Sequence, residues 1–426
     1  YYNIEDRVKQ SLDAYQLSGA AGAAMKNLSG GQKRFVELVR VEHSAADLAL
    51  IDEPTNHMDY VAKAMFLKWF ANVKHAVVVI THDRDLLQKV TRIIEIKDAA
   101  AYNFAGNYTA YLKQNANITA NNLNEYDTLQ RRIINIKKQI NSARAKKAST
   151  SKTPNPFVVI ENRLVKELAE LEIIERPSFW IDQESVAGLR PKIEASYQKH
   201  KAKTIHIKRF SAVERQRELL KLDKVQVGYQ KPLFDPLSLA VASGERYRLI
   251  GRNGAGKTTL VNTILSGSDK QRPATWLGGD IIKDLKLRIN NYDQEIDEAL
   301  LDLKLGQAIE KVYSLYDVPC NDEKIMRTLS DYLFDPYMDR EQLVGNLSGG
   351  QKARLQLIKL FANDPNLLIV DEPTNHLDLP SIEELEAALA QYRGALIYIS
   401  HDSYLANHLG GSEISLGQKS SLVQPG

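Results

Sequence analysis

The chain of 426 residues contains a long internal repeat, and this repeat limits the possible folds more than any other feature. Residues 28–59 align without a gap to residues 347–378, and 15 of the 32 positions are identical. A constant offset of 319 residues relates the two copies, so that His82 corresponds to His401. Solenoid repeats have periods of roughly 20–50 residues, so a repeat with this offset indicates duplication of a large domain.

Short apolar runs alternate with helical patterns in both copies. The runs at 47–52 and 366–371 lead into acidic pairs, and the runs at 76–83 and 395–402 end in His-Asp. This alternation predicts an α/β fold with a mostly parallel sheet. Antiparallel strands are expected in addition at 223–241.

A phosphate-binding loop precedes the second copy. Residues 251–258 match G-x-x-x-x-G-K-[ST] and lie between an apolar strand at 244–250 and an amphipathic helix at 258–267. The backbone N–H groups of such a loop surround phosphates at a helix N-terminus. Lys257 is expected to reach the β- and γ-phosphates, and Thr258 is expected to ligate Mg²⁺.

Acidic residues and a histidine at the strand ends predict hydrolytic chemistry. Asp371 is expected to hold Mg²⁺, and the adjacent Glu372 to orient or deprotonate the attacking water, because successive side chains of a strand alternate in direction. His401 follows Glu372 by 29 residues, the same spacing as in the first copy, and is expected to contact the γ-phosphate. Gln294 is a candidate for sensing metal and water. The residues expected to bind the metal are Thr258, Gln294, Asp371 and Asp52.

The sequence LSGGQ occurs twice, at 28–32 and 347–351. Ser-Gly-Gly before a helix offers backbone N–H groups, a hydroxyl and the positive end of a helix dipole, so it predicts a second anion-binding site. Simple helix capping is the alternative, and the matched spacing of both copies from an acidic strand end favours anion binding.

LSGGQ followed by DEPTNHMD or DEPTNHLD and a later His-Asp resembles the ATP-binding cassette superfamily. Two such cassettes in one chain, with Asn-His after the acidic pair, resemble the ABC-F subfamily of translation factors and ribosome-protection proteins. The cassette likeness covers about 20–105 and 222–415, and GNYTAYL at 106–112 resembles the junction into the interdomain linker. It implies two P-loop cassettes, paired head to tail within the chain and joined by an antiparallel α-helical hairpin.

The resemblance implies the site residues and the cofactors ATP and Mg²⁺. One composite site is complete, and Tyr229 stands where such cassettes often have an adenine-stacking aromatic, with ordinary strand packing as the alternative. The implied catalytic residues are Glu372, His401, Glu53 and His82. The implied nucleotide-binding residues are Tyr229, Gly251, Asn253, Gly254, Gly256, Lys257, Thr258, Thr259, Gln294, Ser29, Gly31, Asp59, Ser348 and Gly350.

The middle of the chain predicts a helical hairpin. Apolar residues at helical spacing form two stripes, namely Leu129, Ile133, Ile136 and Ile140, and Phe157, Ile160, Leu164, Leu168 and Leu171. STSKTPNP at 149–156 is a turn between two arms of about 20 residues, each spanning about 30 Å, and Pro177 ends the second arm.

The hairpin is basic. Residues 111–220 hold 21 Lys or Arg and 12 Asp or Glu, and residues 129–153 hold eight basic residues without an acidic one. This distribution suggests a polyanionic partner, and a solvated helix face is the alternative. The residues expected to bind RNA are Arg144, Lys146, Lys147 and Lys152.

The expected domains are a first cassette at 1–106, a linker at 107–219 and a second cassette at 220–426. The offset puts the phosphate loop of the first copy about 60 residues before Tyr1, so the chain is expected to be N-terminally truncated. The single cysteine, Cys320, excludes a disulfide framework and a metal site built on several thiolates. The chain is therefore expected to be reduced, cytoplasmic and soluble. No apolar run reaches the length of about 18 residues that a spanning helix needs, which excludes such a helix.

The resemblance implies an ATPase that binds the ribosome near the exit-tRNA site and regulates or rescues translation through ATP-dependent closure of its cassettes. The expected partners are rRNA and tRNA, contacted by the basic linker. A DNA- or RNA-binding ABC-F relative is the main alternative. A transporter ATPase is a weaker one because it requires a membrane subunit, and none is expected here.

Overall fold

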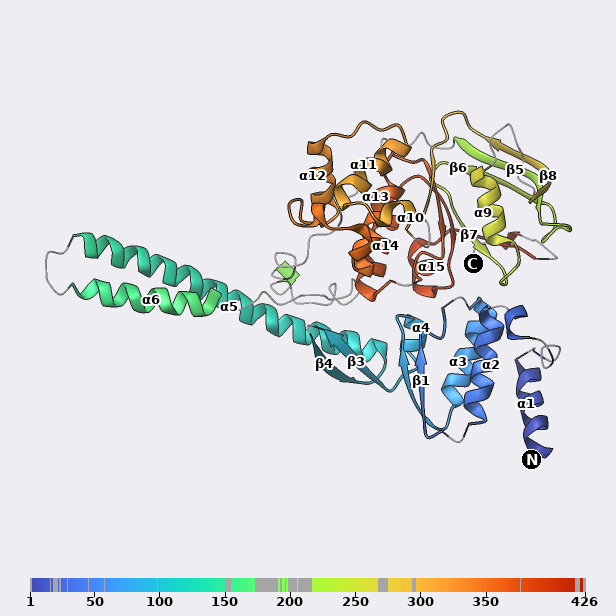
Figure 1. Ribbon diagram of the computed structural model, residues 1–426, viewed down its shortest axis with the longest axis horizontal. Coiled ribbons are helices and arrows are strands. Elements are labelled where there is room, and N and C mark those ends of the chain that lie inside the picture. Colours follow the sequence, from blue (N-terminus) through green and yellow to red (C-terminus); the bar gives the residue numbers. More distant parts are fainter. Residues whose placement is uncertain are drawn as a thin grey trace. The chain divides into compact units, whose positions relative to one another are not determined.

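The computed structural model divides the chain into two compact units, Tyr1–Lys89 with Thr204–Gly426, and Val90–Lys203. Each unit is considered by itself (Figure 1). Pro177, the predicted end of the second hairpin arm, lies outside the described residues. The structure describes residues 2–15, 17, 22, 24–28, 30–44, 46–56, 58–97, 99–149, 155–172, 191, 194–195, 197, 205, 217–266, 275–292, 296–375, 377–417 and 422–423.

A mostly parallel sheet with the strand order β13-β12-β7-β11-β10-β9 forms the centre of the second cassette, as the alternating pattern predicts. Its central strands are fully buried apolar runs, which is typical of parallel sheets covered on both faces. The strands are β7 (Arg246–Ile250), β9 (Ile289–Tyr292), β10 (Leu367–Asp371), β11 (Ala395–Ile399), β12 (Ser412–Ser415) and β13 (Leu422–Val423).

A second, antiparallel sheet has the order β6-β5-β8 and confirms the antiparallel strands expected around 223–241. Its strands are β5 (Glu218–Val227), β6 (Leu237–Ala242) and β8 (Trp276–Lys283). Buried side chains of this sheet, of the helix α9 (Lys257–Ser266) and of one face of the parallel sheet form a common core. The phosphate loop therefore leaves β7 and enters α9 between two packed layers.

Helices cover the other face of the parallel sheet and form a separate core with it (Figure 1). The α-helices are α10 (Glu298–Leu301), α11 (Leu305–Leu315), α12 (Asp322–Asp331), α13 (Gly349–Leu360), α14 (Leu379–Gln391) and α15 (Ser403–Leu409). Two 3₁₀ turns are η3 (Asp339–Glu341) and η4 (Val344–Asn346).

The first copy has the same local order of elements around a parallel pair, β1-β2. Its elements are α1 (Tyr2–Ala14), η2 (Met25–Asn27), α2 (Gly30–Glu42), β1 (Leu48–Asp52), α3 (Tyr60–Asn72), β2 (Ala76–Ile80) and α4 (Arg84–Leu87). One face of the pair is solvent-exposed, with Leu50 at 76% and Ile80 at 61% exposure, whereas the corresponding Ile369 and Ile399 are each 1% exposed. This face of the parallel sheet is therefore covered in the second copy and exposed in the described part of the first.

The other unit contains the antiparallel pair β3 (Arg92–Lys97) and β4 (Ala100–Ala105), followed by the helices α5 (Tyr108–Ala148) and α6 (Pro156–Glu172). Gly106 has φ +102°, and the Asn107 side chain caps α5 by accepting from the Ala110 N–H at 3.2 Å. The expected junction motif is therefore the start of α5. Glycine suits position 106 because it adopts a left-handed backbone without steric cost.

The helices α5 and α6 form the expected antiparallel hairpin, with Ile136, Ile140 and Leu164 buried between them. The first arm is longer than expected, because α5 begins at Tyr108 and its 41 residues span about 60 Å. The expected stripe is also wrong at Ile160, which is 39% exposed because the contact runs through Leu164 and Leu168 instead.

We expect Leu164→Ala to destabilise the hairpin by about 2–4 kcal/mol, because it opens a cavity between Ile136 and Ile140. Ile160→Ala, on the same helix, serves as the control and should cost less than about 1 kcal/mol. Amide hydrogen exchange across α5 and α6 measures both opening free energies. Equal effects of the two substitutions would contradict the packing described for α6.

Candidate functional site

The phosphate loop is folded by its glycines and its lysine. Gly254 and Gly256 have φ +81° and +93°, and a Cβ at Gly256 would lie 3.1 Å from Leu233. The Lys257 ammonium donates to the Gly251 carbonyl at 2.6 Å, so it spans the loop from within. Both features fix the conformation of a loop of the type whose backbone N–H groups bind phosphates.

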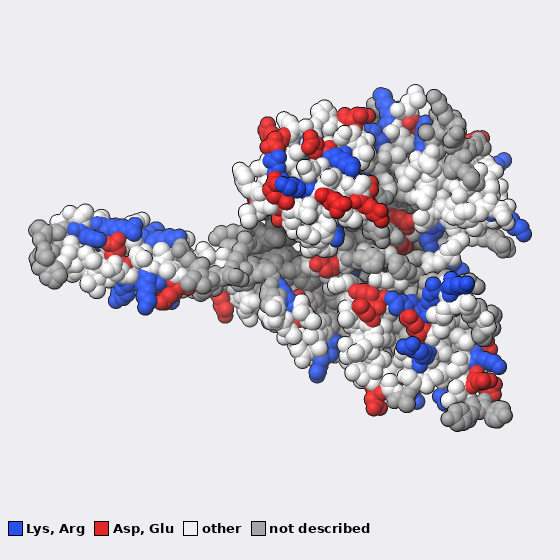
Figure 2. All heavy atoms as spheres, in the orientation of Figure 1, with Lys and Arg blue, Asp and Glu red and all other residues white. Residues whose placement is uncertain are grey.

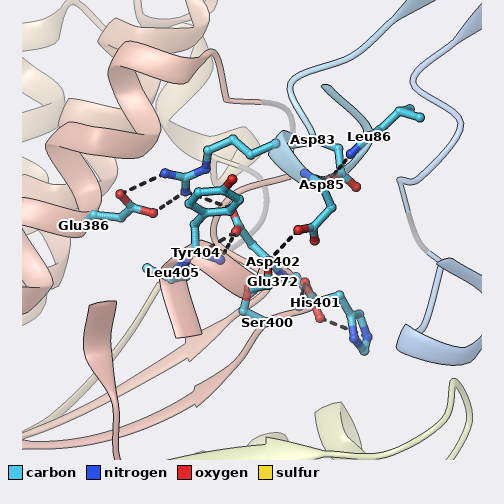
Figure 3. A network of polar contacts seen from close by, with 12 residues as sticks. Asp83, Asp85, Leu86, Glu372, Glu386, Ser400, His401, Asp402, Tyr404 and Leu405 are labelled. Carbon is cyan, nitrogen blue, oxygen red and sulfur yellow. Dashed lines mark hydrogen bonds and ion pairs between the residues drawn. The ribbon is translucent and has the colours of Figure 1, made fainter. Parts of the chain in front are cut away.

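The carboxyl ends of β10 and β11 bring the acidic pair and the histidine together. The parallel register aligns Asp371 with Ile399, and the Glu372 N–H donates to the Ile399 carbonyl at 2.9 Å. The Thr258 hydroxyl donates to Asp371 Oδ2 at 2.8 Å, which joins the loop to the strand end. Glu372 Oε1 lies 3.2 Å from His401 Nε2, and the two side chains face each other in Figure 3.

Burial determines the protonation of this pair. It raises the pKa of Glu372 to about 7, with a further contribution from Asp371, although the His401 N–H opposes the shift. Burial and the positive charge of Lys257 lower the pKa of His401 to about 4. At neutral pH the imidazole is therefore uncharged, and its contact with Glu372 is not an ion pair.

The first copy repeats this arrangement in a more open form. His82 Nε2 lies 3.7 Å from Glu53 Oε1, and their side chains are 45% and 25% exposed, against 16% and 15% for His401 and Glu372. Burial, together with Asp52, raises the pKa of Glu53 to about 7, and burial lowers the pKa of His82. Both strand ends therefore produce a carboxyl group that titrates near neutrality.

Residues of the two copies line one cavity of about 500 Å³. At its edge the Asn253 N–H of the phosphate loop donates to Asp59 Oδ2 at 2.9 Å, while Asp59 Oδ1 accepts from the Ala62 N–H and caps α3. These bonds lower the pKa of the Asp59 carboxyl even though its burial acts in the opposite direction. The cavity is lined by Glu53, Thr55, Asn56, Met58, Lys63, His82, Asp83, Asn253, Lys257, Thr258, Asp371, Glu372, Thr374, Asn375, Leu377, Ile382, His401 and Asp402.

Several sequence-predicted residues lie away from this cavity or outside the described residues. Gly31 is buried and does not line it. Ser348 caps α13 by accepting from the Gln351 N–H at 3.2 Å, and a Cβ at Gly350 would lie 2.8 Å from the Ser381 hydroxyl. Ser29, Gln294 and Lys152 are among the residues whose structure is not described.

The remaining predicted residues have varied positions. Tyr229 is 73% exposed after β5, so it does not pack as an ordinary strand residue. Thr259 lies in the first turn of α9, where its carbonyl accepts from the Thr263 hydroxyl at 2.8 Å. Asp52 ends β1.

Sequence reasoning missed several cavity-lining residues. Thr55 and Asn56, with their counterparts Thr374 and Asn375, line the cavity directly after the acidic pairs. All four belong to the segment that is identical in both copies, which is a signal that could have identified them.

The hairpin carries the expected basic surface, but acidic residues of α6 compensate part of it. Arg144 and Lys147 contact Glu161 at 2.8 and 3.0 Å, and Arg132 contacts Glu167 at 2.6 Å. The interpretation that no acid balances residues 129–153 is therefore wrong, because folding brings α6 against them. Lys and Arg still gather along the hairpin in Figure 2, and the described basic residues are all exposed.

Comparison with known proteins agrees with this geometry. The family model described as ABC transporter matches residues 234–375. The chain is 31% identical over 396 residues to the putative ATP-binding protein YdiF of Bacillus subtilis (strain 168), covering 92% of this chain and 55% of that protein. It is 28% identical over 399 residues to the ribosome protection protein VmlR of the same organism, covering 91% and 68%.

A plant relative and solved structures extend the comparison. The ABC transporter F family member 5 of Arabidopsis thaliana is 29% identical over 395 residues, covering 91% of this chain and 51% of that protein. The solved structure of an RNase-L Inhibitor matches with a TM-score of 0.56 and 15% identity, covering 97% of this chain and 67% of that one. At this identity the structural match shows the fold alone.

The fold and the site together define an ATP-binding cassette protein. Its motifs and its relatives are consistent with the ABC-F type within that superfamily. It spans about half the length of most of the curated relatives named here, and 68% of VmlR. Among the described residues, no helix combines the length and the apolar character needed to cross a membrane.

Glu372 should make stability depend on pH in metal-free, nucleotide-free buffer. Its folded pKa of about 7 exceeds the ordinary value of 4.5, so the folded chain holds an extra proton in that window and loses stability as pH rises through it. Glu372→Gln removes this loss. We expect its stabilisation, relative to the native chain, to be about 2 kcal/mol larger at pH 8.5 than at pH 5.5.

Urea unfolding at the two pH values measures this difference. Glu323→Gln, at an exposed position of α12, is the matched control and should show no such pH dependence. A Glu372→Gln effect that is the same at both pH values would show that this carboxyl titrates normally.

Proposed function

We propose that the chain is the cassette ATPase part of a ribosome-associated ABC-F protein, and that ATP is hydrolysed at the site built on residues 251–258. One observation carries the proposal, namely the hydrogen bond at 2.8 Å between Thr258 and Asp371 beside the facing pair Glu372 and His401. This bond brings the phosphate loop and the two proposed metal ligands, Thr258 and Asp371, to the edge of the sheet where the candidate base Glu372 lies.

The residues present fit a nucleotide with Mg²⁺. Gly254 and Gly256 give the loop the left-handed backbone typical of phosphate loops, and Lys257 supplies a cation whose pKa is lowered by burial. Thr258 and Asp371 are oxygen donors, the ligand type that Mg²⁺ prefers, and they would hold the ion together with substrate phosphates. The bound ion would neutralise charge on the transferred phosphoryl group.

Glu372 has the properties of a general base for this reaction. Its pKa of about 7 matches the operating pH, so that it accepts a proton from water without being strongly hydrated itself. The neutral His401 carries a single N–H, which would donate to a phosphate oxygen when ATP is bound. Asp59, bonded to Asn253, would hold the opposing copy against the loop.

Tyr229 and the LSGGQ segments complete the proposed binding of ATP. The exposed ring of Tyr229 is available for stacking on a base. Ser29 and Gly31 would face the site built on 251–258, and Ser348 and Gly350 would serve the site that includes Glu53 and His82.

Ribosome association is proposed from the relatives and from the charge of the hairpin. VmlR is named a ribosome protection protein, and one solved structure of the same fold is a model of ribosome-bound archaeal Pelota and ABCE1. The exposed basic residues of α5 would contact RNA phosphates. The proposed domains are 1–106, 107–219 and 220–426, although the compact units group residues 90–106 with the hairpin and residues 204–219 with the second cassette.

Lys257→Ala and Glu372→Gln should have different effects on ATP. Lys257→Ala removes a phosphate-binding cation and should weaken ATP binding, while Glu372→Gln should retain binding and lower the hydrolysis rate by roughly 100-fold or more. Nucleotide titration and single-turnover hydrolysis measure the two steps. Lys286→Ala, at an exposed residue outside the cavity, is the control. A hydrolysis rate in Glu372→Gln equal to that of the native chain would contradict the general-base role of Glu372.

Replacing Arg144, Lys146, Lys147 and Lys152 by alanine should weaken ribosome binding. Each lost phosphate contact should flatten the log–log salt dependence by roughly 0.7–0.9. Part of the charge is already balanced by Glu161, so we expect a total change nearer two contacts than four. Ribosome co-sedimentation over a salt series measures this change.

The matched control replaces four basic residues of the second cassette, Lys221, Lys231, Lys286 and Arg327, which are exposed. It should leave affinity and slope as in the native chain. If both quadruple variants bind alike, the hairpin residues form a solvated face. If duplex DNA displaces the ribosome, the DNA-binding alternative gains support.

A further inference from the structure

A buried ionic cluster joins the two copies beside the cavity. Arg84, 7% exposed, comes from the first copy and donates through both terminal nitrogens to the carboxylate of Glu386 in α14, which is 6% exposed. Its Nη2 also donates to Asp402 Oδ2 at 3.0 Å, and its guanidinium lies 4.7 Å from the centre of the Tyr404 ring. Figure 3 shows Glu386, Asp402 and Tyr404 around this ionic cluster.

Asp402 is held on two sides. Its Oδ1 caps α15 by accepting from the Tyr404 N–H at 2.8 Å, and its Oδ2 accepts from Arg84. The residue that follows His401 is therefore fixed to the helix of its own copy and to a cation of the other copy.

A second cation of the first copy reaches the same segment. Lys63 of α3, 8% exposed, pairs with Asp83 at 2.9 Å and Asp85 at 2.7 Å, and donates to the main-chain carbonyl of His401 at 3.3 Å. Burial alone would lower the pKa of Lys63, but the two carboxylates raise it above its ordinary value, so the ammonium stays charged. In return, the Ser403 hydroxyl donates to Asp85 at 2.7 Å.

The internal repeat shows that only the first copy supplies such cations to the other copy. At the offset of 319 residues, Lys63 corresponds to Ile382, Arg84 to Ser403, and Glu386 to Leu67. The second copy therefore has no cation at the positions from which the first copy holds residues 401–402. Asp83, the counterpart of Asp402, pairs with Lys63 of its own copy instead.

We propose that Lys63 and Arg84 are positioning residues for the site built on 251–258, which hold the segment 401–402 only while the two copies are in contact. His401 can then face Glu372 only when the first copy supplies its two cations. The equivalent Asp83 is instead paired with Lys63 of its own copy, so no cation of the second copy holds it among the described contacts. The proposal rests on the proposed function for its kinetic consequence, but the positioning itself is measurable without hydrolysis.

The test uses the full chain with Lys63→Met, Arg84→Met and Asp402→Asn. Methionine keeps an apolar stem without the charge, and asparagine keeps the cap of α15 while it removes the ion pair with Arg84. The controls are Lys68→Met and Lys89→Met, at exposed positions of the first copy outside the cavity. Thermal unfolding of each variant shows whether it is folded.

Amide hydrogen exchange of residues 399–406 is the first readout, and the kcat and KM for ATP are the second. We expect faster exchange in all three variants, and a fall in kcat of roughly tenfold with a KM changed less than about threefold, because the substitutions displace His401 rather than the phosphate loop. Arg84→Lys should restore part of both. Adding Glu386→Gln to Arg84→Met should cost little more, since the two residues act as one unit.

Two outcomes separate the possible failures. If exchange and kcat in Lys63→Met, Arg84→Met and Asp402→Asn equal those of the controls while the native chain hydrolyses ATP, the positioning role is wrong and the proposed function stands. If the native chain does not hydrolyse ATP, the proposed function fails, and exchange at 399–406 alone still decides whether these cations hold the segment.

Discussion

The parallel pairing of β10 with β11 is the constraint on which the candidate site depends. The register places Asp371 opposite Ile399, and the Glu372 N–H continues the ladder by one bond to the Ile399 carbonyl. Two residues further along β11's course the chain reaches His401, so the acid and the imidazole have to meet at this edge. The same pairing in the first copy, with the Glu53 N–H bonded to Ile80, brings Glu53 toward His82.

Much of this was predictable because the information is local or repeated. Strands expected at 366–371 and 395–402 are observed at Leu367–Asp371 and Ala395–Ile399, and the phosphate loop lies between its strand and helix as expected. The charge balance of the hairpin was not predictable from a window of sequence. Glu161 neutralises Arg144 only after the turn reverses the chain, and composition along the chain does not reveal that partner.

The internal repeat predicts the shared motifs of the two copies but not the contacts in which the copies differ. Fifteen identities in 32 positions suggest equivalent sites, yet the buried cations that join the copies, Lys63 and Arg84, lie outside that segment and correspond to Ile382 and Ser403. Arg84 and Ser403 occupy matching positions and both cross to the other copy, one as a buried cation and the other as a neutral hydroxyl. A buried cation is stable only when it is paired, so Arg84 depends on Glu386 and Asp402 of the second copy, whereas Ser403 needs no such partners.

Backbone strain and burial at Glu53 and Glu372 both indicate a chemical role for these residues. Glu53 and Glu372 have φ of 40° and 45°, a left-handed conformation that is unfavourable for a glutamate, and each carboxyl group has its pKa raised to about 7. Neither feature stabilises the folded chain, since both the strained turn and the buried charge cost free energy. Costs that coincide at the same residue in both copies are typical of groups retained for chemistry rather than for packing. The general-base role proposed for Glu372 accounts for both costs, whereas a purely structural strand end would need neither.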